Sequence, residues 1–147
     1  MELDGVKSMI EEMIPFGKKV GVKLESAKPR EVKLSIPHEP TNLSPFGSFH
    51  PGALTTLGET AIGALLLVSF DPSKVSFVNK DIYIRFRRPG MSTASASLTM
   101  DEATVKAIEA ETLEKGKLDK QFDCPITDET GTVIAEMKGT FQFRKAG

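Results

Sequence analysis

Apolar and polar residues alternate along the chain with two different periods, and the order of these periods predicts a mixed domain of helices and strands. A helical period runs over residues 3–13 and stops at Pro15, which indicates a short amphipathic helix. Its apolar positions are Leu3, Val6, Ile10 and Met13. A period of two follows over residues 20–24 and again over 32–36, with a Lys-Pro-Arg turn between them, and this predicts a β-hairpin.

The rest of the chain repeats the same two periods. We expect a long helix over 51–70, strands over 82–86 and 94–100, a helix capped by Asp101 and ended by Gly116, and a final hairpin of 117–127 with 132–144. Residues 37–49 are rich in Pro, Ser, Asn and Gly and are expected to form an ordered loop. The sequence therefore predicts one α+β domain spanning residues 1–147, for which a generic α+β sandwich is the plain alternative.

The long helix carries an unusual distribution of charge. Between Leu43 and Phe70 the only formally charged residue is Glu59. On a helical wheel one stripe is apolar, formed by Leu54, Leu57, Ala61, Leu65 and Val68, and the opposite stripe is small or polar, formed by Gly52, Thr56, Glu59, Thr60 and Gly63. A helix with so little charge is normally buried. We therefore expect a sheet to wrap around its apolar side and a partner surface or a cleft to lie against the other.

Glu59 is the candidate for chemistry in this helix. Burying a lone carboxylate is costly unless it is paired, protonated or hydrogen-bonded, so a carboxylate in such a segment points to a functional site with a shifted pKa. The alternative is a structural ion pair with an arginine of the following strand, Arg85 or Arg87. The two interpretations differ in whether the carboxylate contacts a cation.

The segment from Gly47 to Ala61, GSFHPGALTTLGETA, closely resembles the signature G-x-x-H-G-G-A-L-x-T-L-A-D/E-T-A of hotdog-fold thioesterases of the phenylacetic-acid-degradation type. The resemblance extends in outline to the whole chain through the F-x-R-P turn at 86–89 and the D-x-x-G-x-x-x-A hairpin at 128–135. The helix over 101–116 is similar to a less characterised branch of unknown function. The resemblance implies a hotdog fold, in which an antiparallel sheet wraps around one long central helix. It also implies a homodimer or a dimer of dimers, with acyl-CoA or a related thioester bound where two protomers meet.

The resemblance also implies roles for individual residues. Glu59 falls on the family's catalytic carboxylate, His50 on the motif histidine, and Gly52 on the second glycine at the helix start. Thioester hydrolysis needs a carboxylate to activate water or to attack directly, and helix-terminal amides to hold the developing oxyanion. Further substrate contacts are expected from Asn42, Ser44, Ala53, Thr56, Thr60, Arg85, Arg87 and Arg88. The three arginines would meet CoA phosphates, and ordinary solvated strand charge is the alternative for them.

Two departures from the family pattern bear on activity. The asparagine usually found six residues before the motif histidine is replaced by Ser44, and Asn42 lies two positions earlier. The first glycine of the pair is Pro51, which has no amide hydrogen to donate, so Gly52 or Ala53 would have to replace that donor. An acyl-CoA thioesterase and a non-catalytic hotdog protein that binds an acyl-CoA or lipid-like ligand therefore both fit the sequence.

The amino-acid composition argues against several other kinds of site and partner. Two histidines and one cysteine cannot build a closed Cys/His zinc site, and one cysteine forms no internal disulfide, so we expect no metal, no cofactor and a reducing compartment, the cytoplasm. The 19 basic and 20 acidic residues leave a net charge of −1, which does not favour nucleic-acid binding. The acidic residues near the N-terminus and the shortness of the longest apolar run, 61–68, predict neither a secretory leader nor a membrane span.

Motifs of three other enzyme classes do not occur in the sequence. The chain has no G-x-S-x-G, no G-x-G-x-x-G and no P-loop, which argues against a serine hydrolase elbow, a dinucleotide fold and an NTPase. Cys124 lies in a predicted strand without a basic neighbour and is expected to be a buried apolar residue rather than a nucleophile. His38 has no motif around it and is assigned no role.

Overall fold

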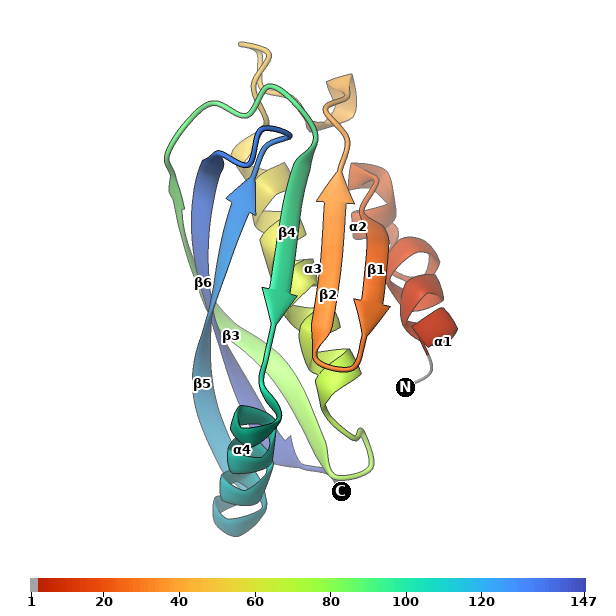
Figure 1. Ribbon diagram of the computed structural model, residues 1–147, viewed down its shortest axis with the longest axis vertical. Coiled ribbons are helices and arrows are strands. Elements are labelled where there is room, and N and C mark those ends of the chain that lie inside the picture. The colour runs from red at the N-terminus through yellow and green to blue at the C-terminus, as the bar shows by residue number, and fades with distance from the viewer. Residues whose placement is uncertain (1–2) are drawn as a thin grey trace.

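One antiparallel sheet of six strands curves around the long helix α3, Pro51–Ser69, in the computed structural model, which describes residues 3–147 (Figure 1). The strands are β1 Lys23–Lys28, β2 Glu31–Ile36, β3 Val75–Phe86, β4 Ala94–Thr99, β5 Lys117–Thr127 and β6 Val133–Lys145. Their order across the sheet is β1-β2-β4-β5-β6-β3. The predicted α+β fold, a sheet wrapped around one long central helix, is confirmed.

Both predicted hairpins are present. β1 pairs with β2, with Lys28 opposite Glu31 at the turn, and β5 pairs with β6 along nearly their whole length. The second turn is held by Asp128, whose Oδ1 accepts hydrogen bonds from the amides of Thr130 and Thr132. These local pairings follow from period-two segments joined by short polar turns.

The N-terminal region differs from the prediction of one helix ending at Pro15. Helix α1, Leu3–Ser8, continues into the π-helical turn η1, Met9–Met13, and Pro15 then begins a further helix, α2, Pro15–Val20. Proline is well suited to a first helical position because its missing amide hydrogen would have no partner there. The first strand of the hairpin consequently begins at Lys23 rather than at residue 20. α1 and α2 pack beside α3, next to the β1 edge of the sheet (Figure 1).

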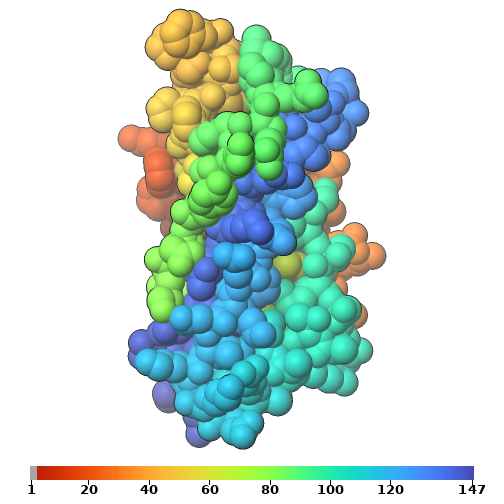
Figure 2. Space-filling view, turned by 90° about the vertical axis from the view of Figure 1, so that its left-hand side faces the viewer, coloured from red at the N-terminus to blue at the C-terminus, as the bar shows by residue number. Residues whose placement is uncertain are grey.

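The strand predicted over 82–86 is longer than expected and lies at one edge of the sheet. β3 begins at Val75 and pairs only with β6, so it forms one edge of the sheet, while β4 lies between β2 and β5. Alternate residues of β4 are buried, whereas on β3 Ile82 is 38% exposed and Phe86 is 45% exposed. In Figure 2 the light green segment of β3 runs along this face of the molecule. The protomer therefore leaves an apolar strand edge uncovered.

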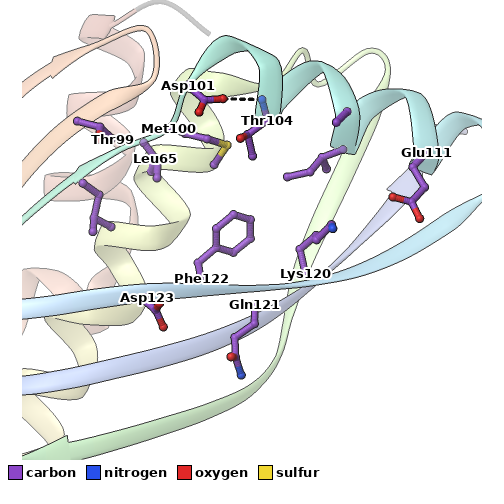
Figure 3. Close-up of a pocket in the computed structure, with 13 residues that line it drawn as sticks. Leu65, Thr99, Met100, Asp101, Thr104, Glu111, Lys120, Gln121, Phe122 and Asp123 are labelled. Carbon is purple, nitrogen blue, oxygen red and sulfur yellow. Dashed lines mark hydrogen bonds between the residues drawn. The ribbon is translucent and has the colours of Figure 1, made fainter.

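The sheet opens between β4 and β5. The two strands pair only where Ser95 lies opposite Thr127, and the connection between them contains helix α4, Glu102–Lys115. Asp101 caps α4 by accepting the Thr104 amide, as predicted (Figure 3). The opening forms a hollow of about 540 Å³ between α4 and the strands, with Leu65 and Phe122 among its apolar lining (Figure 3).

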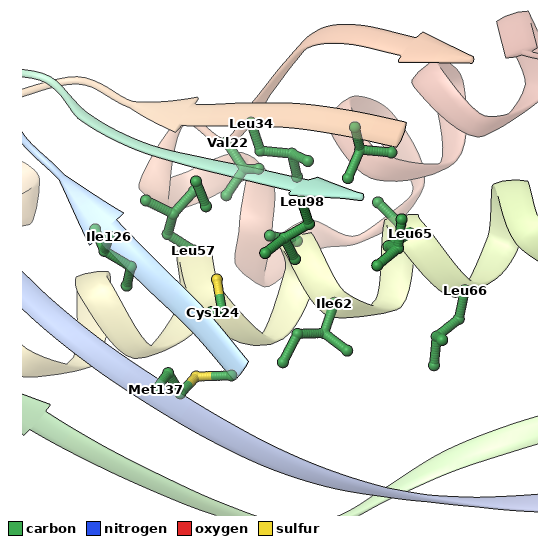
Figure 4. Packing of buried hydrophobic residues seen from close by; sticks show 14 of the residues in the cluster. Val22, Leu34, Leu57, Ile62, Leu65, Leu66, Leu98, Cys124, Ile126 and Met137 are labelled. Carbon is green, nitrogen blue, oxygen red and sulfur yellow. The ribbon is translucent and has the colours of Figure 1, made fainter. Parts of the chain in front are cut away.

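The core forms where α3 packs on the concave face of the sheet. Apolar side chains of α3 meet those of the strands in one cluster, shown in part by Figure 4: Leu57, Ile62, Leu65 and Leu66 on the helix, and Leu34, Leu98, Cys124, Ile126 and Met137 on the strands. α3 is long and apolar enough to cross a membrane by length and composition alone, a property that core helices share, and more than half of it is buried inside the domain. The helix expected over 51–70 is therefore confirmed as the central element.

Candidate active site

The loop leading into α3 is held by backbone hydrogen bonds near its end. The His50 amide donates to the Asn42 carbonyl at 2.8 Å, and the Phe49 amide donates to the Gly90 carbonyl at 3.1 Å. Leu43 and Phe49 also form an isolated β-bridge. These contacts fix His50 at the first turn of α3, beside the turn that follows β3.

Asn42 and Ser44 both stabilise this loop. Asn42 is buried, and its Nδ2 donates to the carbonyls of Val20 at 2.8 Å and Pro37 at 2.9 Å, while its Oδ1 is buried with no partner among residues 3–147. The Ser44 hydroxyl accepts the Phe46 amide at 3.2 Å. Both amide hydrogens of Asn42 are thus used within the protein, so a substrate contact by this side chain, which stays a prediction, would fall on Oδ1 as an acceptor.

The first turn of α3 has no unengaged backbone amide. Pro51 has no amide hydrogen, and the Gly52 amide donates to Nδ1 of His50 at 2.8 Å. The amides of Ala53 and Leu54 both donate to the His50 carbonyl, at 3.0 and 3.4 Å. The two amides expected to replace the missing donor are therefore already hydrogen-bonded inside the helix cap.

Glu59 is a half-buried carboxylate without a partner. Burial raises the pKa of its carboxyl, and among residues 3–147 no hydrogen bond or ion pair holds it. Arg87, one of the two arginines considered for a structural ion pair, instead contacts Glu136 on β6, with Nη2 at 2.6 Å and Nε at 2.9 Å from the same carboxylate oxygen. Within residues 3–147 no cation or hydrogen-bond donor offsets the cost of burying the charge on Glu59.

The spacing of His50 and Glu59 separates them within one protomer. They are nine residues apart along α3, which corresponds to about 13.5 Å along the helix axis at 1.5 Å per residue. Groups that act on one carbonyl must each lie within about 3 Å of the reacting atoms. The two side chains of a single protomer therefore start from well-separated positions on α3 and do not contact one another.

The two threonines expected to contact substrate lie between these positions on α3. The Thr56 hydroxyl donates to the Gly52 carbonyl at 2.8 Å, which leaves its oxygen free only to accept. Thr60 is buried in the protomer, unlike its half-buried neighbours Thr56 and Glu59. Substrate contacts by these hydroxyls stay predictions.

A hollow of about 310 Å³ lies beside the first turn of α3, against the turn that follows β3. Its lining consists of Phe49, Pro51, Leu54, Phe86, Arg87, Arg88, Pro89 and Gly90. Gly90 is required here because a Cβ at this position would lie 2.6 Å from Phe49 Cδ2 and 2.8 Å from Ile134 Cδ1. The sequence pattern placed a turn at residues 86–89 but did not indicate that Phe49 or Gly90 would line this hollow.

The three arginines differ in their surroundings. Arg87 is engaged with Glu136, as described above, and Arg88 is exposed at the rim of the 310 Å³ hollow. Arg85 is exposed on β3, facing solvent in the protomer. The side chain best placed to meet a ligand at the start of α3 is therefore that of Arg88.

The remaining candidates have structural roles or none. Cys124 is fully buried, and burial raises the pKa of its thiol to about 12, in agreement with its expected role as a buried apolar residue. Nε2 of His38 lies 2.8 Å from the Gly47 carbonyl, and its ring meets Phe49 edge to face. Among residues 3–147 no three His, Cys, Asp or Glu side chains gather as metal ligands would.

Comparisons with known proteins agree with this architecture. The model of a family described as a domain of unknown function, DUF4442, matches residues 4–142. Among solved structures, a protein of unknown function from Pseudomonas aeruginosa, described as a probable thioesterase, is 32% identical and has a TM-score of 0.94 over 99% of this chain and 97% of that one. No curated protein matches the chain.

More distant structures share the same fold. A protein of unknown function from Chlorobaculum tepidum is 15% identical and has a TM-score of 0.80 over 97% of this chain and 93% of that one. A thioesterase from Haemophilus influenzae is 14% identical, with a TM-score of 0.75 over 99% of this chain and 92% of that one. The chain therefore has the hotdog fold of these proteins.

Proposed function

The chain belongs to the DUF4442 family and has the hotdog fold, and we propose on this basis that it is a thioesterase that hydrolyses acyl-CoA. The observation that carries the proposal is Glu59, a half-buried, unpaired carboxylate with a raised pKa on a helix that has no other formal charge. Such groups are typical of catalytic sites. The probable thioesterase that is 32% identical over nearly the whole chain supports the reaction class.

The proposed reaction uses Glu59 as a general base. The ionised carboxylate takes a proton from water as the water oxygen attacks the thioester carbonyl carbon, which gives a tetrahedral oxyanion. The oxyanion then collapses, the carbon–sulfur bond breaks, and the leaving thiolate receives the proton from Glu59. The products are a carboxylic acid and a free thiol, and the carboxylate is restored. Direct attack by the carboxylate, followed by hydrolysis of the anhydride, gives the same products.

We propose that two protomers share each site. Glu59 and His50 of one protomer start about 13.5 Å apart along α3, a spacing that favours a site in which a second copy supplies one of them. The edge strand β3 offers a surface for that copy, because its outer edge is unpaired and its apolar residues are exposed, Val78 at 57% and Tyr83 at 59%. Pairing of β3 with its symmetry mate would continue the sheet and cover these residues.

The arginines at the end of β3 suggest how the CoA part would bind. Arg88 lies at the rim of the hollow beside the start of α3, where an exposed guanidinium can pair with a phosphate oxygen. Arg87 is held by Glu136 and would have to leave that ion pair to bind phosphate. We therefore assign the phosphate contact to Arg88, with Arg85 as a second contact. The finer assignment to the phenylacetic-acid-degradation type stays a prediction.

A second function is favoured by one observation, the engagement of every amide at the start of α3. With Pro51 lacking a hydrogen and the next three amides bonded to His50, the backbone offers no donor for an oxyanion. A protein of this kind could bind an acyl-CoA without hydrolysing it. Hydrolysis requires that a group other than these backbone amides donates a hydrogen bond to the oxyanion, whereas binding alone does not.

Glu59→Gln is the experiment that tests the proposed function. Thiol release is measured with short, medium, long and aromatic acyl-CoAs, and the variant is expected to lose activity by about 10² or more, in the range of general-base loss, while calorimetric ligand affinity is kept. The matched control is Glu114→Gln, an exposed carboxylate on α4, which should leave turnover unchanged. A wild type that binds one of these esters at micromolar concentration and hydrolyses none would establish the binding function instead.

A further inference from the structure

Thioester hydrolysis requires a hydrogen-bond donor where negative charge develops on the carbonyl oxygen. A helix N-terminus normally supplies such donors from its first amides. In α3 those amides are absent or occupied, since Pro51 has no hydrogen and Gly52, Ala53 and Leu54 all donate to atoms of His50. His50, which accepts the hydrogen bonds of these amides, is therefore the residue to consider as the hydrogen-bond donor in their place.

The hydrogen bond from Gly52 determines which nitrogen of the imidazole carries hydrogen. Nδ1 of His50 accepts the Gly52 amide at 2.8 Å, so Nδ1 has no hydrogen of its own. A neutral imidazole has a single N–H, which must then lie on Nε2. Because Nδ1 is turned toward the helix, Nε2 lies on the far side of the ring, and His50 is exposed in the protomer. We infer that His50 Nε2–H is the oxyanion donor of the proposed thioesterase, in place of a backbone amide.

Gly52 is suited to this arrangement by its lack of a side chain. A Cβ at position 52 would lie 3.0 Å from His50 Nδ1 and 3.2 Å from Cε1, closer than ordinary van der Waals contact. Glycine therefore lets the ring rest against the start of the helix, where the amide fixes its tautomer. Gly52 thus acts as a positioning residue. In the sequence His-Pro-Gly, the proline removes a backbone donor and the histidine ring supplies a side-chain donor.

The loop before α3 holds the proposed donor in place. The His50 amide is bonded to the carbonyl of Asn42, whose side chain is buried and tied to Val20 at the end of α2. His50 is thus fixed at both its backbone and its ring. A donor fixed before the reaction costs no reorganisation when charge develops on the carbonyl oxygen, which is the condition for effective stabilisation of an oxyanion.

A spectroscopic measurement tests the tautomer independently of activity. In protein labelled with ¹⁵N-histidine at pH 8, His50 is expected to show an unprotonated Nδ1 and a protonated Nε2, with the signals of His38 identified from a His38→Gln variant. In Gly52→Ala, the added methyl group displaces the ring, and the hydrogen bond to Nδ1 should be lost. A hydrogen found on Nδ1 of the wild type would overturn the inference.

The kinetic test removes the imidazole and keeps the helix cap. Serine is a favourable N-cap residue, so His50→Ser should fold like the wild type but lose about 10² to 10³ in kcat, the usual effect of removing one oxyanion donor, with KM little changed. His38→Gln is the matched control and should keep kcat. Adding Pro51→Gly to His50→Ser restores an amide hydrogen at the first helical position and should recover at least part of kcat.

The outcomes separate this inference from the proposed function on which it rests. A wild type without hydrolysis on the whole acyl-CoA panel overturns both. If the wild type is active and His50→Ser keeps kcat, the function stands and the inference is overturned. A His50→Ser variant that is inactive and gains nothing from Pro51→Gly also overturns it, because the defect then does not lie in the lost donor.

Discussion

The carboxylate of Glu59 shows how one residue links the stability of the protomer to its chemistry. It is half-buried, and the described part of the protomer offers it neither a cation nor a hydrogen-bond donor, so its charged form is held at a cost in stability. Nothing in the core requires a carboxylate at this point of α3, where the neighbouring residues are apolar or small. A residue kept at the expense of stability is typical of an active site.

The cost of this charge should appear in the pH dependence of stability. Burial raises the pKa of Glu59 above its ordinary value of 4.5, so its contribution to stability is fully present below pH 4.5 and is lost as pH rises through the folded-state pKa. Glu59→Gln removes the charge. The variant should therefore be more stable than the wild type at pH 8, by about 1 kcal/mol or less because water screens a half-exposed group.

Thermal unfolding from pH 4 to pH 8 measures the difference between the two proteins. The gap should close toward pH 4, where the wild-type carboxyl is protonated in both states. Glu114→Gln, on the exposed face of α4, should show no such pH-dependent gap. A Glu59→Gln protein that is less stable than the wild type at pH 8 would indicate a favourable partner for the carboxylate and would contradict its description as an unpaired charge.

At the residue scale, the sequence predicted a buried carboxylate at Glu59 but not the contacts among the residues around the start of α3. Glu59 could be found because one charge in an apolar helix is visible in the sequence. The pairing of Arg87 with Glu136 could not be found, since it depends on the register of β3 against β6. The bond from Gly52 to the ring of His50 likewise depends on a side-chain rotamer and on a close approach that only coordinates show.

At the element scale, Gly58 marks a close contact between α3 and the sheet. A Cβ at this position would lie 2.7 Å from Sδ of Met137 on β6, so glycine is the residue that lets helix and strand meet. A glycine inside a helix lowers helix stability by about 1 kcal/mol relative to alanine, which shows that packing rather than helix propensity selects it. This contact is one place where side-chain size limits how closely α3 packs against β6.

Gly58→Ala should therefore destabilise the fold despite the better helix propensity of alanine. Overpacking typically costs about 1–3 kcal/mol, so we expect a net loss of about 1 kcal/mol in urea unfolding at one fixed protein concentration. In a Met137→Ala background the clash is absent, and the same substitution should become neutral or stabilising. Gly63→Ala, with no heavy atom within 4 Å of the added carbon, should be stabilising by itself. Equal effects of Gly58→Ala in both backgrounds would contradict the close contact.

Elements with strong local patterns were predicted well, and elements that depend on distant partners were not. α3, α4 and the hairpin of β5 with β6 have clear periods and clear ends, such as Pro51 and Gly116. The N-terminal helices were mispredicted because Pro15 ends one helical pattern and also begins the next helix. The first half of β3 was missed because its alternation is interrupted by a bulge between Asn79 and Asp81.

At the scale of the whole molecule, the protomer is incomplete in two respects that one partner could complete. It exposes apolar residues along the edge strand β3, and it separates His50 from Glu59 by about 13.5 Å along α3. A two-fold partner that pairs along β3 would cover the exposed apolar residues of that strand. The same pairing would bring His50 of one copy toward Glu59 of the other. The shared site and the dimer are thus one proposal, and a test of either should involve both.

Complementation between inactive variants tests this shared site. If each site takes Glu59 from one copy and His50 from the other, a mixed dimer of Glu59→Gln with His50→Ser contains one fully wild-type site. Refolding the two variants together in equal amounts should then restore about a quarter of wild-type kcat per chain, because half of the dimers are mixed and one of their two sites is intact. If each protomer carries its own site, no intact site forms and the mixture stays inactive.

The reverse mixture gives an internal control. Wild type refolded with an equal amount of the double variant, Glu59→Gln with His50→Ser, should keep about a quarter of the activity if the site is shared, since only wild-type dimers are active, but about half if it is not. Light scattering on each mixture should give a mass near twice the 16.0 kDa of one chain, or a multiple of that dimer. The shared site is contradicted if both mixtures form dimers, the mixture of the two single variants stays inactive, and the mixture of wild type with the double variant keeps half of its activity. The chemistry would then lie within one protomer.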